Sequence, residues 1–124
     1  MRGVKSTAVG YSGGTSEHPT YKTVCAGDGH TEVVAVEFDP TVIPYERLLE
    51  IFWREHDPTR PAKAQYRSVV FATTPAQLAA ATASKARHAA SRRIVTAIEP
   101  LRKFWLAEEY HQRYVEKRKA RYGV

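Results

Sequence analysis

The residue types most suited to chemistry in this 124-residue chain are concentrated between Gly10 and Glu32. Tyr21, Cys25 and Glu32 stand close together in this stretch, which also contains several glycines and lies between two segments with strand-like patterns. A thiol is a nucleophile when ionised, a carboxyl group can transfer a proton, and a phenol donates a hydrogen bond. We therefore interpret residues 10–32 as the chemical centre of the protein.

Two strands and a loop are predicted to position this centre. Residues 4–10 alternate small, β-branched and polar side chains and stop before a pair of glycines, which is typical of a short strand and a turn. Residues 15–29 are then predicted to form a loop. Residues 33–38 are a β-branched run closed by an Asp-Pro pair, which predicts a strand covered on both faces. Glu32 falls at the threshold of that strand.

A helix is predicted next, because apolar residues recur at spacings of three and four from Tyr45 to Trp53. A Thr-Pro-Ala-Gln cap predicts the start of a second, Ala-rich helix at residue 74. The remaining predicted elements are strands over residues 66–72 and 93–99 and an amphipathic helix over residues 105–118. This order predicts one α+β domain, residues 1–124, with helices covering a sheet in two layers.

The composition excludes several classes of protein. No apolar run approaches the ~18 residues that a membrane span needs, and the N-terminus lacks the apolar core of a signal peptide, so we expect a cytoplasmic protein without membrane contact. Cys25 is the only cysteine, so an intramolecular disulfide is excluded. The five histidines have no recognisable metal spacing, and we expect neither a metal nor a bound cofactor.

The formal charge of +6 is unevenly distributed. Residues 1–57 carry five Lys/Arg against nine Asp/Glu, whereas residues 58–124 carry fourteen against four. A basic half attracts nucleic acid or anionic membrane, but here the charges are dispersed along predicted helices. Aromatic or groove-reading motifs are also absent, so nucleic-acid binding is not expected as the main function.

The centre resembles the core of the A-type peptide methionine sulfoxide reductases, thiol enzymes that reduce the S-epimer of methionine sulfoxide, in proteins or as the free amino acid, to methionine. The resemblance covers nearly the whole chain and implies the mixed-sheet plait of that family, with the family's first strand absent. The segments that carry it, in the family's order, are Glu37-Phe38-Asp39-Pro40, Tyr45-Glu46-Arg47-Leu48-Leu49, Phe52-Trp53, His56-Asp57-Pro58-Thr59, Gln65-Tyr66-Arg67-Ser68, Ile98-Glu99-Pro100 and Ala107-Glu108-Glu109-Tyr110-His111-Gln112.

The resemblance implies that Glu32 is the proton donor and that Tyr21 and Tyr66 direct their hydroxyls at the sulfoxide oxygen. A carboxyl group at the edge of an apolar strand is partly desolvated, which favours its protonated form, and a phenol remains a donor at neutral pH. The alternative interpretation is that Glu32 is an exposed strand-edge charge and that both tyrosines are core packing.

Other residues near the centre are expected to be structural. Gly10, Gly13 and Gly14 are assigned to backbone turns, because glycine adopts conformations that other residues avoid. His30 and His56 are interpreted as hydrogen-bonded structural histidines without a catalytic role.

The nucleophile of the family is missing from this pattern. In the family the catalytic cysteine lies in a Gly-Cys-Phe-Trp segment upstream of the first strand read here, and recycling cysteines often follow near the C-terminus. Cys25 matches a non-catalytic cysteine of the family, and its apolar neighbour Val24 predicts a packed, inert thiol. We therefore expect no nucleophile in this chain and little or no reductase activity. A start assigned too late, or a truncated gene, would produce such a sequence.

Two departures from the family pattern accompany this gap. The loop between Thr59 and Gln65 lacks the family's Gly-Asn-Asp element, whose Asp helps to arrange the site. The segment from Cys25 to Glu32 is one residue shorter than is usual in the family. Both changes affect the parts of the chain that would position Glu32 and Tyr66.

Three functions remain open on the sequence. The first is a reductase that lacks its N-terminal strand; the resemblance implies an external thiol, such as thioredoxin or dithiothreitol, as its reductant. The second is a non-catalytic module that binds methionine sulfoxide. The third is a basic adaptor that contacts an acidic partner through residues 85–121. The sheet position left by the absent strand also predicts a homodimer or aggregation, because unpaired strand edges pair with other chains.

Overall fold

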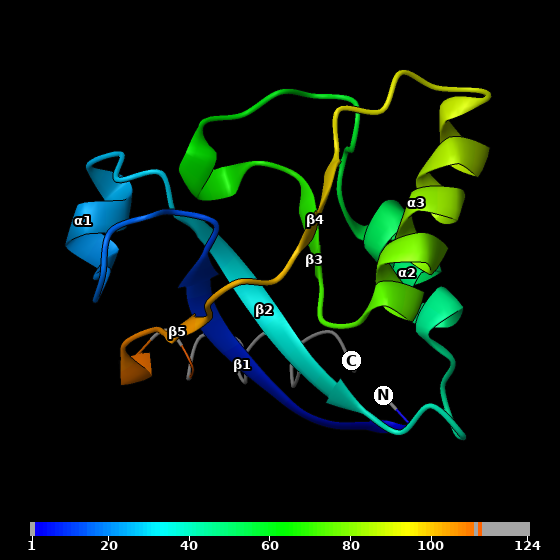
Figure 1. Cartoon of the computed structure of the whole chain (residues 1–124), viewed down its shortest axis with the longest axis horizontal. Coiled ribbons are helices and arrows are strands. Elements are labelled where there is room, and N and C mark those ends of the chain that lie inside the picture. The colour runs from blue at the N-terminus through cyan, green and yellow to red at the C-terminus, as the bar shows by residue number, and fades with distance from the viewer. Residues whose placement is uncertain (1, 111, 113–124) are drawn as a thin grey trace.

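The computed structural model describes residues 2–110 and 112, which form two small sheets and a pair of packed helices, one of which covers the second sheet (Figure 1). One sheet is antiparallel and has the strand order β2-β1-β5, and the other is the parallel pair β3-β4. The predicted α+β class is confirmed. The elements, in chain order, are β1 (Val4–Ser12), α1 (Tyr21–Cys25), β2 (Thr31–Phe38), α2 (Tyr45–Glu55), the short 3₁₀ helix η1 (Ala64–Tyr66), β3 (Val69–Ala72), α3 (Pro75–Ala89), β4 (Ala97–Pro100) and β5 (Trp105–Leu106).

The β1–β2 pair is the longest ladder in the described structure. It runs from Val4 opposite Phe38 to Ser12 opposite Thr31, so both strands are longer than their side-chain alternation predicts. Inter-strand hydrogen bonds extend the ladder through Ser12 and Thr31, where the sequence pattern has already ended. Glu32 consequently lies within β2 and not at its threshold.

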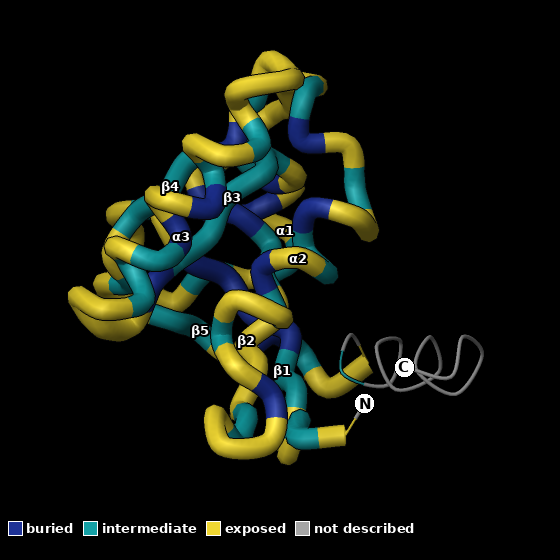
Figure 2. The backbone as a smooth tube through the Cα atoms, turned by 90° about the vertical axis from the view of Figure 1, so that its right-hand side faces the viewer, coloured by how far each residue is buried: buried dark blue, intermediate teal, exposed yellow. Residues whose placement is uncertain are grey.

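The middle of β2 is open to solvent (Figure 2), since residues 34–37 are all exposed and alternate between the two faces of the strand. Val34 is 52% exposed and Val36 is 40% exposed, so the prediction of a strand covered on both faces is wrong. The physical reason is that β2 is the last strand of its sheet, and β3, the next strand along the chain, belongs to the other sheet.

The helices α2 and α3 pack against each other and provide the second core (Figure 1). The apolar stripe predicted for α2 is confirmed, because Leu49 and Trp53 are buried against Ala81 of α3. The indole nitrogen of Trp53 donates a hydrogen bond to Ser84 Oγ at 2.7 Å, which satisfies the polar atom of this buried ring. Helix α3 also packs on β3 and β4, so it connects the parallel pair in the usual crossover manner.

Several predicted boundaries are wrong. The predicted loop contains helix α1, and the strand predicted over residues 66–72 begins only at Val69 because residues 64–66 form η1. The strand predicted over residues 93–99 is observed as Ala97–Pro100.

The helix predicted from residue 105 is also wrong at its start, since Trp105–Leu106 form strand β5 beside Gly10 and Tyr11 of β1. Gly10 permits this pairing: a Cβ atom there would lie 2.3 Å from the Phe104 ring and 2.5 Å from the Trp105 carbonyl oxygen. Residues 109, 110 and 112 are helical, and residues 111 and 113–118 of the predicted helix lie outside the described residues.

The described segments, residues 2–110 and 112, contain no helix with both the length and the apolar character required to cross a bilayer. The longest helix among them, α3, has 15 residues, and most of its side chains are polar or small.

Candidate active site

Helix α1 sets the position of Tyr21. The helix begins because Thr20 and Thr23 cap it reciprocally: Thr20 Oγ1 accepts from the Thr23 nitrogen at 3.2 Å, and the Thr20 nitrogen donates to Thr23 Oγ1 at 2.9 Å. Tyr21 is the first helical residue and Cys25 is the last. Residues four apart lie on the same face of a helix, so the phenol and the thiol are neighbours.

The hydroxyl of Tyr21 lies against both Cys25 and Tyr66. A hydrogen bond with Cys25 and the charge of that thiol are the main reasons why the pKa of Tyr21 is raised from 10.0 to about 12, and the charge of Tyr66, burial and a hydrogen bond with Tyr66 add to the effect. Tyr21 therefore stays protonated, and remains a hydrogen-bond donor, well above neutral pH. The two tyrosines singled out in the sequence are brought together from α1 and η1.

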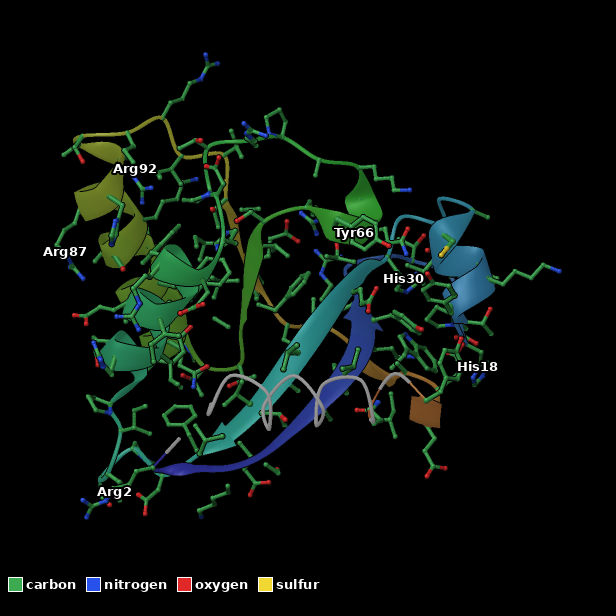
Figure 3. The ribbon with its side chains drawn as sticks, turned by 180° about the vertical axis from the view of Figure 1, so that it is seen from behind. Arg2, His18, His30, Tyr66, Arg87 and Arg92 are labelled. Atoms are coloured by element: carbon green, nitrogen blue, oxygen red, sulfur yellow. The ribbon has the colours of Figure 1, made fainter. Side chains whose placement is uncertain are left out.

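Glu32 and Tyr66 line one groove. This groove has a volume of about 580 Å³ and runs between β2 and β3 over the side chains of α2. Figure 3 shows Tyr66 on η1, next to the N-terminal end of β2. Tyr66 is 56% exposed, which excludes the alternative that it is core packing. Glu32 is half-buried, and the pairing register sets it opposite Tyr11.

The loop before Tyr66 is anchored despite its short length. Thr31 Oγ1 donates to the carbonyl oxygen of Ala64 at 2.8 Å, and Arg67 Nε donates to Thr31 Oγ1 at 2.9 Å. Arg67 also donates from Nη1 to Glu99 Oε2 at 2.8 Å. Hydrogen bonding from Arg67 is the favourable contribution that leaves the pKa of Glu99 below its usual value. Arg67 thus connects Thr31 of β2 to Glu99 of β4, and these bonds fix the backbone next to Tyr66.

Glu108 is a positioning residue that the sequence interpretation missed. It accepts a hydrogen bond from the Tyr11 hydroxyl at 2.9 Å through Oε1 and from the backbone nitrogen of Tyr21 at 3.1 Å through Oε2. Tyr11 is fully buried, and its burial, followed by the hydrogen bond to Glu108, raises the pKa of its hydroxyl. The resemblance included Glu108 in a matching segment, but no chemical role followed from its neighbours in the sequence.

The residue Gln112 reinforces this region. Its side-chain amide pairs with the backbone of Val9 in both directions, accepting from the nitrogen at 2.7 Å and donating to the carbonyl oxygen at 2.7 Å. A third bond from Nε2 reaches the carbonyl oxygen of Ala107 at 3.1 Å. The side chain thus continues the β1–β5 pairing beyond the end of β5, and holds the segment that contains Glu108 against β1.

Cys25 does not have the environment predicted for it. The prediction of a packed thiol is wrong: Cys25 is exposed, whereas its neighbour Val24 is the buried residue of α1. The helix turns Val24 toward Val9 and Tyr11, which leaves the next side chain facing outward. The buried amide of Gln65 donates a hydrogen bond from Nε2 to Cys25 Sγ at 3.1 Å.

The histidines near the site are structural. Both ring nitrogens of His56 are hydrogen-bonded, Nδ1 with the carbonyl oxygen of Phe52 and Nε2 with Ser68 Oγ, each at 2.6 Å. His30 is 1% exposed, and its Nδ1 lies 3.2 Å from Asp28 Oδ1. The expectation that the His30 ring is fully hydrogen-bonded is wrong, because within residues 2–110 and 112 Nδ1 has only the contact with Asp28 and Nε2 has no hydrogen-bond partner.

The glycines have two different functions. Gly13 has a φ of +89°, in agreement with the turn predicted for it. Gly14 is required by packing, since a Cβ atom there would lie 2.3 Å from Nδ1 of His30. Gly10 is likewise a close-contact position within β1, so its assignment to a turn is wrong.

The donor set of the site suits an uncharged oxygen acceptor. Two phenols can donate, Tyr66 in the lining of the apolar groove and Tyr21 beside it, and the Glu32 carboxyl group lines the same groove. Among the residues that the structure describes, no three His, Cys, Asp or Glu side chains are grouped so that they could hold a metal ion.

The model of the family described as peptide methionine sulfoxide reductase matches residues 1–124. The chain belongs to this family. It is 54% identical over 127 residues to the peptide methionine sulfoxide reductase MsrA of Methanoculleus marisnigri, with 94% of this chain and 77% of that protein covered. It is 50% identical over 129 residues to the MsrA of Geobacter sulfurreducens, with 94% and 78% covered.

Solved structures of the reductase family share the fold. Mxr1 of Saccharomyces cerevisiae in its reduced form has a TM-score of 0.83 at 35% identity, covering 93% of this chain and 72% of that one. Methionine sulfoxide reductase A of Corynebacterium diphtheriae has a TM-score of 0.81 at 34% identity, and the chain spans 64% of its length. A third structure, Mxr1 in complex with Trx2, has a TM-score of 0.64 at 28% identity.

Proposed function

We propose that Tyr21, Tyr66 and Glu32 form the oxygen-binding and proton-donating part of a methionine sulfoxide site. The 124 residues bind methionine-(S)-sulfoxide in oxidised proteins or as the free amino acid, and on their own they reduce it little or not at all. The observation that carries the proposal is the contact between the Tyr21 and Tyr66 hydroxyls at the end of the groove that Glu32 also lines.

The chemistry of a sulfoxide matches these side chains. Its oxygen is a strong hydrogen-bond acceptor that can take bonds from two phenols at once. Its methyl group and methylene chain are apolar and fit beside Val33 and Phe104, which line the same groove as Glu32 and Tyr66. A protonated Glu32 would donate to the same oxygen and supply a proton when that oxygen leaves as water.

Reduction also requires a thiol that attacks sulfur. In the balanced reaction with dithiothreitol, methionine sulfoxide and two thiols yield methionine, one disulfide and water. Cys25, the only cysteine of these 124 residues, is hydrogen-bonded with Tyr21, one of the two phenols assigned to the oxygen. A thiol in that position faces the oxygen end of the substrate and competes for its donor, so we assign Cys25 no nucleophilic role.

A thioredoxin-type protein is the reductant proposed for the complete reaction of this family. The structure of Mxr1 in complex with Trx2 supports this choice, because a relative with the same fold forms that complex. Dithiothreitol serves as a small substitute in an assay.

The experiment for this proposal is calorimetric titration of the 124-residue chain with a peptide that contains methionine-(S)-sulfoxide. Tyr21→Phe and Tyr66→Phe each remove one donor, and each should weaken binding about twofold to tenfold. Tyr45→Phe is the matched control, because Tyr45 lines the same groove from α2 but stacks beside Phe38, at the opposite end of β2 from Glu32. Equal affinity of all four proteins would overturn the assignment.

A further inference from the structure

We infer that the end of the molecule around the C-terminus of α3 is a docking surface for an acidic peptide segment of a partner protein. This surface, the basic end, consists of Arg60, Lys85, Arg87, Arg92 and Arg93. Figure 3 shows Arg87 and Arg92 together at one side of the molecule, away from Tyr66 and His30. The inference therefore goes beyond sulfoxide binding and does not depend on it.

The charge of the chain is least balanced in the segment that forms this surface. Residues 58–98 contain no Asp or Glu. Their Lys and Arg residues are Arg60, Lys63, Arg67, Lys85, Arg87, Arg92 and Arg93. Two of these belong to the surroundings of the candidate site, since Lys63 Nζ lies over the Tyr66 ring and Arg67 is paired with Glu99. The other five make up the basic end.

Backbone hydrogen bonds bring these five residues together from α3 and two loops. The Arg92 nitrogen donates to the carbonyl oxygen of His88 at 3.2 Å, so the loop after α3 folds back on the last turn of the helix. The Val95 nitrogen donates to the carbonyl oxygen of Pro58 at 2.8 Å, which places the same loop beside the segment that contains Arg60. Charges that are spread along the sequence are thus gathered at one end of the fold.

The described carboxylates neutralise little of this charge. Asp57 Oδ2 lies 3.3 Å from Arg60 Nε, and Asp57 Oδ1 accepts a hydrogen bond from the Thr59 nitrogen at 3.0 Å. The other four cations of the basic end make no ion pair within residues 2–110 and 112. The helix dipole of α3 contributes only about half an elementary charge at its C-terminus, which offsets Arg87 in part. A positive potential therefore remains at this end of the molecule.

The composition of the basic end favours an acidic peptide over nucleic acid or membrane. Residues 57–63 and 85–95 contain no Phe, Tyr or Trp, so no such ring is present to stack on a base or to insert at a membrane interface. Ala89, Ala90 and Val95 are exposed among the arginines and can pack against small aliphatic side chains. The guanidinium groups can bind carboxylates through two parallel hydrogen bonds. An acidic segment that also carries aliphatic residues matches both features.

The test is fluorescence anisotropy at physiological salt with a labelled peptide of glutamates interrupted by two valines. The control peptide has glutamine in place of every glutamate. Arg92→Glu/Arg93→Glu reverses two charges of the exposed loop, and Lys5→Glu/Lys22→Glu is the matched control, because these lysines are exposed on β1 and α1 and the net charge changes equally. The acidic peptide should bind the loop variant about tenfold or more weakly, and the control variant within about twofold of the wild type, because salt screens distant charges.

Carbodiimide coupling, which joins a carboxylate to a neighbouring amine, should attach the acidic peptide to Lys85 and not to Lys5 or Lys22, as measured by mass spectrometry. Arg92→Gln/Arg93→Gln removes the charges without reversing them and should weaken binding about threefold or more. The inference is overturned if the two peptides bind equally, if the loop and control variants bind alike, or if the three lysines are coupled equally. Tighter binding of a single-stranded oligothymidylate or of anionic vesicles would also overturn it and would make nucleic acid or a membrane the partner.

Discussion

Glu108 accepts a hydrogen bond from the backbone nitrogen of Tyr21 at 3.1 Å, and this bond ties the start of α1 to the segment that follows β5. The same carboxylate holds the hydroxyl of the fully buried Tyr11 at 2.9 Å. A carboxylate at the first turn of a helix is also favoured by the free N–H groups there. The position of the Tyr21 phenol therefore depends on a residue from the opposite end of the described chain.

Replacing Glu108 by alanine should destabilise the protein, because it leaves the buried Tyr11 hydroxyl without its acceptor. The expected loss of unfolding free energy is about 1–3 kcal/mol in urea denaturation. Sulfoxide affinity should fall as well, since α1 loses its anchor. Glu17→Ala, an exposed change in the loop before α1, should alter neither quantity. Unchanged stability of the Glu108 variant would remove the positioning role.

The titration of Tyr21 should depend on Cys25. Because the thiol is the main cause of the raised value, Cys25→Ala should lower the pKa of Tyr21 from about 12 toward 10.0. Because the pKa of Tyr21 is higher in the folded protein than in the unfolded chain, its protonated hydroxyl stabilises the fold. This stabilisation is fully present below pH 10 and is lost as the pH rises toward 12. Ultraviolet difference titration of the wild type, Cys25→Ala and Tyr21→Phe measures the shift. Identical titration of the wild type and Cys25→Ala would show that the thiol and the phenol are not in contact.

Gly10→Ala should disrupt the β1–β5 pairing. The added methyl group would overlap the Phe104 ring and the Trp105 carbonyl oxygen, and overpacking of this kind costs about 1–3 kcal/mol. Gly27→Ala is the comparison, because its Cβ would meet no atom within 4 Å and only its φ of +93° opposes the change. Thermal unfolding should show the larger loss at Gly10. A larger loss at Gly27 would contradict the close packing at β5.

Helix α2 could be predicted from the sequence because one continuous apolar stripe stabilises it. Leu49 and Trp53 are the buried residues of that stripe. Strand β5 could not, because Trp105 and Leu106 belong to a helix-like pattern locally and form a strand only by pairing with Gly10 and Tyr11. Helix α1 could not be predicted for a similar reason: five residues show no periodicity, and only the Thr20 cap marks the start of the helix.

The candidate site also contains residues that the sequence predicts and contacts that it does not predict. Tyr21, Tyr66 and Glu32 were identified through the family pattern, and the contact between the two tyrosines arises from tertiary packing of α1 against η1. The role of Glu108 could not be predicted, because its partners Tyr11 and Tyr21 are remote in sequence. The exposure of Val34 and Val36 was also unpredictable, since a β-branched run looks alike in a central strand and at an open sheet edge.

Turnover by the 124-residue chain should be negligible. With methionine-(S)-sulfoxide and excess dithiothreitol, we expect no methionine above the uncatalysed level, because the nucleophilic role has no occupant in the proposed site. Liquid chromatography of the products measures this directly, with a Cys25→Ala variant as the control. Robust turnover that disappears in Cys25→Ala would make Cys25 the nucleophile.

The central claim is tested most directly by calorimetry with three peptides that differ only in one residue: methionine-(S)-sulfoxide, methionine-(R)-sulfoxide and methionine. The site formed by Tyr21, Tyr66 and Glu32 should bind the S-sulfoxide peptide most tightly, and the methionine peptide, which lacks the oxygen acceptor, at least about tenfold more weakly. Equal affinity for all three peptides, or no binding of any of them, would contradict the account.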